Sequence, residues 1–158
     1  MRHLRLLAIV LLCAGCATGK DTTTDDIKAR FDRYERLATQ KAPPTWSIGS
    51  SWAFVATNSA GQIDQSAVFR VTDQPVDACL SGDWKKLEVV KENGLTTHSP
   101  AYVLDGRNLL ILLSTALCDV YPMYSGALDE KGFTGIHSVS GLTGGEEYGQ
   151  VLGVPVLP

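Results

Sequence analysis

Short segments in which apolar and polar residues alternate recur along most of this chain, and turn-forming residues separate them. The clearest pair covers residues 46–57 and 63–72. Successive side chains of a strand point to opposite faces, so this alternation predicts two half-buried strands. Residues 59–62, Ser-Ala-Gly-Gln, predict the turn of a β-hairpin between them. The pattern constrains the chain to a mainly β fold.

Turn dipeptides divide the second half of the chain in the same way. Asn93-Gly94 and Asp105-Gly106 suit the positive φ angles of type I′ turns, and residues 129–132 form another polar turn. Six further strands are expected at residues 83–91, 95–104, 108–115, 121–128, 133–141 and 147–154. The run 108–115 is apolar throughout and rich in leucine, so a helix remains the alternative there.

Eight short strands joined largely by tight turns predict an antiparallel meander. Meanders of this size close into a small barrel or fold into a sandwich, and both arrangements limit exposed strand edges. Pro100 lies inside the fourth expected strand and indicates an edge or a bulge there, because proline cannot donate to the ladder. The choice between barrel and sandwich stays open.

Residues 25–40 predict one short helix before the strands. Asp25 and Asp26 carry the charge that a helix N-terminus favours, and Pro43 and Pro44 would end the helix. Its apolar residues recur with helical period as one stripe: Ile27, Phe31, Tyr34 and Leu37. We expect this stripe to pack on the β domain; a helix that binds a partner is the alternative.

The first 16 residues form a separate unit. Arg2 and Arg5 precede an apolar run over residues 6–12, and the small residues Ala14 and Gly15 follow it. A basic start, a short apolar run and small residues are typical of a secretory signal. The run is shorter than the roughly 20 residues that a membrane-spanning helix needs.

Ala14-Gly15-Cys16 resembles the lipobox of bacterial lipoprotein precursors, with Cys13 where leucine is usual. The resemblance covers residues 1–16 only. It implies cleavage before Cys16, lipid attachment to Cys16 and, because Ala17 follows, transfer to an outer membrane. The implied organisation is a signal peptide (1–15), a tether (16–24) and one β-rich domain (25–158). The implied location is the bacterial cell envelope, with the lipid-anchored domain facing the periplasm.

Two cysteines remain in the domain, Cys79 and Cys118. In an oxidising compartment such a pair predicts a disulfide. A metal site and a catalytic thiol are the alternatives, but two isolated cysteines do not have the spacing of zinc ligands. The sequence therefore favours a disulfide bond.

The charge of the chain narrows the range of partners. Without Arg2 and Arg5, 12 basic residues stand against 17 acidic ones, a net charge near −5. This acidity argues against nucleic acid as a partner, and against anionic lipid as the main one. The membrane contact that we expect is the N-terminal lipid anchor.

His137 is followed by Ser138 and Ser140, so a base and two hydroxyls are close in sequence. Neighbours in a strand point to opposite faces, and no Gly-x-Ser-x-Gly elbow is present. The sequence therefore predicts no catalytic residue, no metal site and no cofactor.

Residues 141–147 are rich in glycine but lack the Lys-Ser/Thr of a phosphate-binding loop. We expect a flexible hairpin loop there that contacts a partner or, through its glutamates, holds a cation weakly. The candidate contact residues are Gly141, Thr143, Gly144, Gly145, Glu146 and Glu147.

Three functions fit these features unequally. The first is a lipid-anchored module that binds or assembles another envelope protein. The second is a carrier that holds a small lipophilic ligand inside a β-barrel, since an eight-stranded barrel has room for one. The third, an envelope hydrolase, has the least support because the sequence offers no nucleophile with a matching base.

Overall fold

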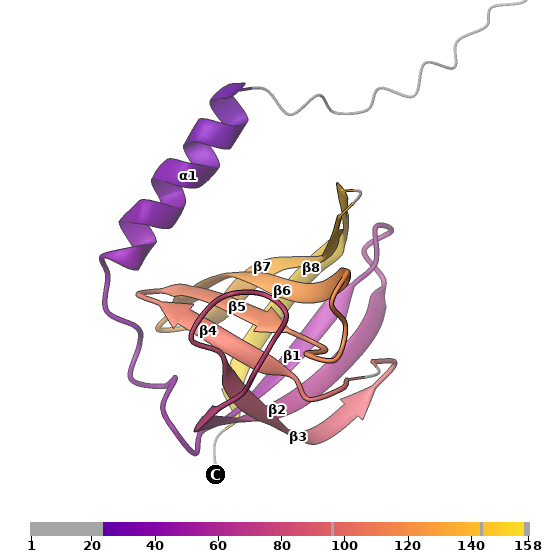
Figure 1. The fold of residues 1–158 in the computed structure, drawn as a ribbon. Coiled ribbons are helices and arrows are strands. Elements are labelled where there is room, and N and C mark those ends of the chain that lie inside the picture. The colour runs from indigo at the N-terminus through magenta and orange to yellow at the C-terminus, as the bar shows by residue number, and fades with distance from the viewer. Residues whose placement is uncertain (1–23, 96, 143, 157–158) are drawn as a thin grey trace, which may run out of the picture.

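In the described part of the chain, eight antiparallel strands close into a barrel, and one helix precedes them and stands beside the barrel (Figure 1). A computed structural model describes residues 24–95, 97–142 and 144–156. The elements are α1 (Thr24–Ala38), β1 (Ser51–Thr57), β2 (Ile63–Pro75), β3 (Lys85–Asn93), β4 (Ala101–Asp105), β5 (Asn108–Leu112), β6 (Val120–Asp129), β7 (Gly132–Gly141) and β8 (Gly144–Val156). Each strand pairs with the next, and β8 pairs with β1. The predicted meander is confirmed, and it forms a barrel.

Several strand boundaries differ from the expectation. The expected strand 46–57 begins only at Ser51, because turns closed by the N–H groups of Trp46 and Ser50 precede it. The expected strand 95–104 is reduced to β4, because Pro100 cannot donate to a ladder and Ser99 has a φ of +52°. The leucine-rich run forms β5, so the helical alternative for it is wrong. β8 begins three residues earlier than expected, at Gly144.

Large side chains fill the interior of the barrel. Trp52, Phe54 and Ala56 alternate along β1 and are almost fully buried. The ring of Phe54 lies between 5.6 and 6.4 Å from four other rings, those of Trp52, Phe69, Tyr124 and Phe133. An eight-stranded barrel has room for its own side chains or for one small ligand. Aromatic side chains occupy that room here.

The segment between α1 and β1 contributes to the same core. Trp46 is buried, and its ring lies 5.1 Å from that of Trp52 and 5.4 Å from that of Tyr102. The indole Nε1 of Trp52 donates a hydrogen bond to the carbonyl oxygen of Thr45 at 3.2 Å. The chain is therefore fixed to the barrel only a few residues after α1 ends.

A second apolar cluster lies outside the barrel wall, around the buried Trp84. Trp84 donates a hydrogen bond from Nε1 to the carbonyl oxygen of Leu80 at 2.8 Å. A disulfide joins Cys79, in this outer segment, to Cys118. The predicted disulfide is confirmed. Closing a loop of 39 residues contributes about 4 kcal/mol in the chain-entropy model.

Two paired glycines make room for the ring of Phe133. Gly126 of β6 lies opposite Gly135 of β7. A Cβ atom on Gly135 would lie 2.5 Å from both Cζ of Phe133 and the carbonyl oxygen of Ser125. The ring therefore lies against bare backbone, and no larger residue fits at position 135 without moving the sheet.

Gly135→Ala is expected to lower the free energy of unfolding by about 1–3 kcal/mol, because the added methyl group overpacks the core. Gly145→Ala, in the neighbouring strand β8, is the matched control. The atom nearest to its new Cβ would be the Val139 carbonyl oxygen, at 3.2 Å. Urea unfolding of both variants and the unsubstituted chain measures the difference. Equal midpoints for the two variants would contradict the packing described.

Candidate functional site

The helix α1 stands away from the barrel wall along most of its length (Figure 1), and none of its residues is buried. Ile27, Phe31 and Tyr34 are 59%, 60% and 50% exposed, while Leu37 is half-buried. The prediction that the apolar stripe packs on the domain is therefore wrong for Ile27 and Phe31, while Tyr34 contacts the barrel through Asp105. An isolated helix of this length is marginal in water, so other contacts must hold it.

The β4–β5 turn holds the C-terminal end of α1. The backbone N–H of Arg107 donates to the Leu37 carbonyl oxygen at 3.0 Å, and Asn108 Nδ2 donates to that of Tyr34 at 2.9 Å. The hydroxyl of Tyr34 donates to Asp105 Oδ2 at 2.9 Å, which raises the pKa of the Tyr34 phenol. Carbonyl groups that a helix end leaves unpaired are thus satisfied by the barrel.

Gly106 allows this close approach. It has a φ of +59°, and a Cβ atom there would lie 2.4 Å from the carbonyl oxygens of both Leu37 and Ala38. The sequence indicated the turn at Asp105-Gly106. No sequence signal connected that turn to a helix about 70 residues earlier, so the contact was missed.

An ion pair connects the N-terminal half of α1 to the barrel. Arg30 Nη1 lies 3.3 Å from Glu147 Oε1, and both side chains are largely exposed. Exposed pairs contribute at most about 1 kcal/mol, so this contact orients the helix more than it stabilises it.

A groove of about 600 Å³ lies between α1 and the outer wall of the barrel. The helix lines it with Arg30, Arg33, Tyr34 and Leu37. A row of outward residues in register across β4 to β8 forms its floor: Val103, Leu110, Ser125, Ile136 and Gln150. The groove thus combines a largely apolar floor with two arginines on its helical side.

The glycine-rich segment forms the expected hairpin, but its loop is shorter than residues 141–147. Gly141 ends β7 and pairs with Gly144, the first residue of β8. Glu146 and Glu147 lie on β8, where backbone pairing orders them. Thr143 lies outside the described residues, and contact with a partner at this hairpin stays a prediction.

His137 is a packed residue at one end of the barrel. The Nε2 atom of the buried Gln65 lies 2.8 and 3.1 Å from the two ring nitrogens of His137. The rings of Tyr124 and Tyr148 lie 5.4 and 5.2 Å from the imidazole. Burial lowers the pKa of His137 below its ordinary value of 6.5, and the nearby carboxylate of Asp64 opposes this in part. The surroundings of His137 are those of a core histidine.

No family model matches the chain, and comparison with curated proteins and with solved structures gives no match. In the described part of the chain, no helix has the length and apolar character to cross a bilayer. Residues 24–95, 97–142 and 144–156 also contain no cluster of three His, Cys, Asp or Glu side chains suited to a metal ion. The class that the geometry defines is a filled eight-stranded barrel with an external groove.

Gly106→Ala is expected to release α1, because the new methyl group would overlap the last helical carbonyl groups. Gly94→Ala is the matched control: Gly94 has a similar φ of +68°, but its Cβ would meet the Asp64 carbonyl oxygen instead. Hydrogen exchange of the α1 amides should quicken at least tenfold in the first variant only. Equal exchange in both variants would show that the turn does not hold the helix.

Stability is expected to fall as the pH drops below about 6.5, the value for an unperturbed histidine. The folded-state pKa of His137 lies below that value, so the unfolded chain binds the proton more readily. His137→Gln should flatten the decline between pH 7.5 and 5.5 relative to the unsubstituted chain. Urea unfolding at both pH values checks this, and an unchanged decline in His137→Gln would contradict it.

Proposed function

We propose that this protein is a lipid-anchored envelope module that binds a segment of another envelope protein in the groove between α1 and the barrel. One observation carries the proposal. A helix without a single buried residue is held by polar contacts above a largely apolar floor, leaving a groove of about 600 Å³. Such a space suits a ligand that supplies the apolar contacts which α1 lacks.

The packed interior favours this function over the lipophilic carrier. A carrier of the expected kind needs a hollow barrel, whereas rings around Phe54 fill this one. The groove on the outer wall is partly open to solvent. Pockets for small ligands usually enclose most of the ligand surface, so an open groove better suits a chain segment that passes through it.

The charge of the groove indicates the chemistry of that segment. Arg30 is paired with Glu147, while Arg33 makes no ion pair within the described residues. A segment with apolar residues for the floor and an acidic residue for Arg33 would be complementary.

The proposed anchor limits where the partner can lie. Cys16 precedes the first residue of α1, Thr24, by eight positions. Eight extended residues reach at most about 29 Å, so an anchored groove stays close to the membrane surface. The several acyl chains of a bacterial lipoprotein would hold the protein there stably. The partner is therefore a membrane protein or a periplasmic protein at the membrane.

Photo-crosslinking in cells tests this function. A photoreactive residue replaces Ala127 in the groove lining, and the control replaces Ile63, which is exposed and lies outside the groove. The full chain with the probe at 127 should capture one envelope protein through an apolar and acidic segment, and the control should not. Cys16→Ser should lower the yield at least several-fold by removing the anchor. Absence of a specific adduct at 127 would refute the groove as the binding site.

A further inference from the structure

A second apolar surface lies on the barrel wall where β8 meets β1. In this pairing Val55 lies opposite Leu152, Ala53 opposite Val154 and Ser51 opposite Val156. Val55, Leu152, Val154 and Val156 point outward and are 36–59% exposed. We call Ala53, Val55, Leu152, Val154 and Val156 the wall patch. Outward positions of a solvated sheet are usually polar, so the aliphatic composition of this patch needs a reason.

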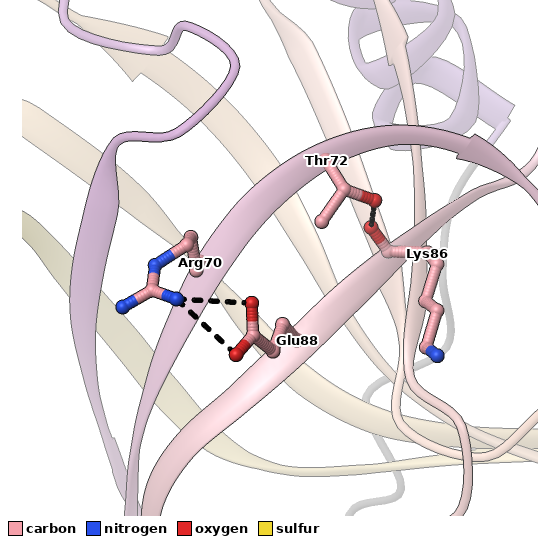
Figure 2. Close-up of polar contacts among 4 residues, drawn as sticks. All are labelled: Arg70, Thr72, Lys86 and Glu88. Carbon is pink, nitrogen blue, oxygen red and sulfur yellow. Dashed lines mark hydrogen bonds and ion pairs between the residues drawn. The ribbon is translucent and has the colours of Figure 1, made fainter.

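Charged residues border the wall patch. A hollow of about 200 Å³ lies beside it, lined in part by Ser66, Val68 and Lys91. Farther along, Arg70 Nη1 lies 3.2 and 3.1 Å from the two carboxylate oxygens of Glu88, and Figure 2 shows this pair bridging neighbouring strands. An apolar centre with a charged border is the arrangement of a protein interface.

The helix α1 carries another apolar surface that nothing in the same chain covers. Ile27 and Phe31 are four residues apart and share one side of the helix. Neither lines the groove, whose helical side consists of other residues. Both are about 60% exposed, although the end of the helix is fixed to the barrel. The contacts within one chain therefore leave this side of α1 uncovered.

We propose that a second copy of this chain covers both surfaces: α1 of each protomer lies across the wall patch of the other. The chain carries both halves of a helix-on-sheet contact, an apolar helical side and an apolar face of the barrel wall. In a dimer with a two-fold axis, each helix contacts the wall patch of the other protomer, so both contacts form together and the assembly is closed. The helix cannot serve its own patch, because its end is bound to the β4–β5 turn and it lies over β4 to β8.

One pair of charges fits this arrangement, and the area sets its strength. Glu35 lies one turn beyond Phe31, and Lys91 lines the hollow beside the wall patch, so these two residues can pair across the contact. A 15-residue helix is about 22 Å long and about 10 Å wide, so two reciprocal contacts cover roughly 900 Å² summed over both protomers. Specific interfaces begin near 1,000 Å², so we expect a weak, reversible dimer that confinement to a membrane would favour.

Disulfide crosslinking in cells tests the proposal with the full chain. Two differently tagged copies are expressed together, one with Phe31→Cys and the other with Val154→Cys, and a mild oxidant is added. A link between positions 31 and 154 can then form only between chains. We expect this heterodimer, and we expect none when Ile63→Cys, at an exposed aliphatic residue off both surfaces, replaces Phe31→Cys. Two tagged wild-type chains report any link through Cys13 or Cys16.

Two results would overturn the proposal. A link between two copies of Val154→Cys without a 31–154 link would mean that the walls face each other, and no link at all would mean that the patch contacts no second copy. Leu152→Asp should lower the 31–154 yield at least tenfold, whereas Val90→Asp, at another exposed aliphatic residue, should not. Crosslinking through position 127 should persist in Leu152→Asp, so this proposal and the groove function can fail separately.

Discussion

Six residues of β1 pair with β8, and this contact turns the sheet into a barrel. Phe54 points inward there and lies against Gly153, where an added Cβ would come within 2.6 Å of its ring. The same pairing places Val55 and Leu152 on the outside. Because side chains alternate strictly along a strand, the register that fills the core also determines the composition of the outer wall. The aromatic interior and the wall patch are two results of one pairing.

Because the barrel is closed and its interior is filled with side chains, a partner can bind only on its outer surface. Each described strand pairs with a neighbour on both sides, although β3 and β4 share only two residue pairs, and rings around Phe54 occupy the space where a ligand would sit. The groove of about 600 Å³ is the surface to which a non-strand element, α1, contributes one side. The β4–β5 turn is central to it, because Arg107 and Asn108 hold α1 above the wall and so form the groove.

Local patterns in the sequence were sufficient for the strands and the disulfide. Alternation over residues 46–72 and the turn dipeptides report backbone geometry within a few residues, which sequence records directly. The position of α1 depends instead on Tyr34 and Asp105, which are 71 positions apart. The period of the stripe shows that the helix is amphipathic but does not identify the surface that its apolar side meets. For that reason the predicted packing of Ile27 and Phe31 was wrong.

The same distinction explains His137 and the glycine-rich segment. A histidine within a strand predicts a polar position at the surface. In the structure, Gln65 and two tyrosine rings from other strands bury His137. Glycine suggested a flexible loop over residues 141–147, but pairing of Gly141 with Gly144 continues the ladder almost to the turn. Contacts between strands determine both the burial of His137 and the length of this loop, and such contacts cannot be recognised in a single sequence.

The helix α1 links the two proposed contacts energetically. One of its sides lines the groove through Arg33 and Tyr34, and another carries Ile27 and Phe31. Its attachment includes hydrogen bonds at one end and an exposed ion pair, and a helix of this length is marginal without further packing. Any ligand that binds only the ordered helix stabilises that order, and the next ligand then loses less conformational entropy. Groove binding and dimerisation would therefore favour each other without a change in the barrel.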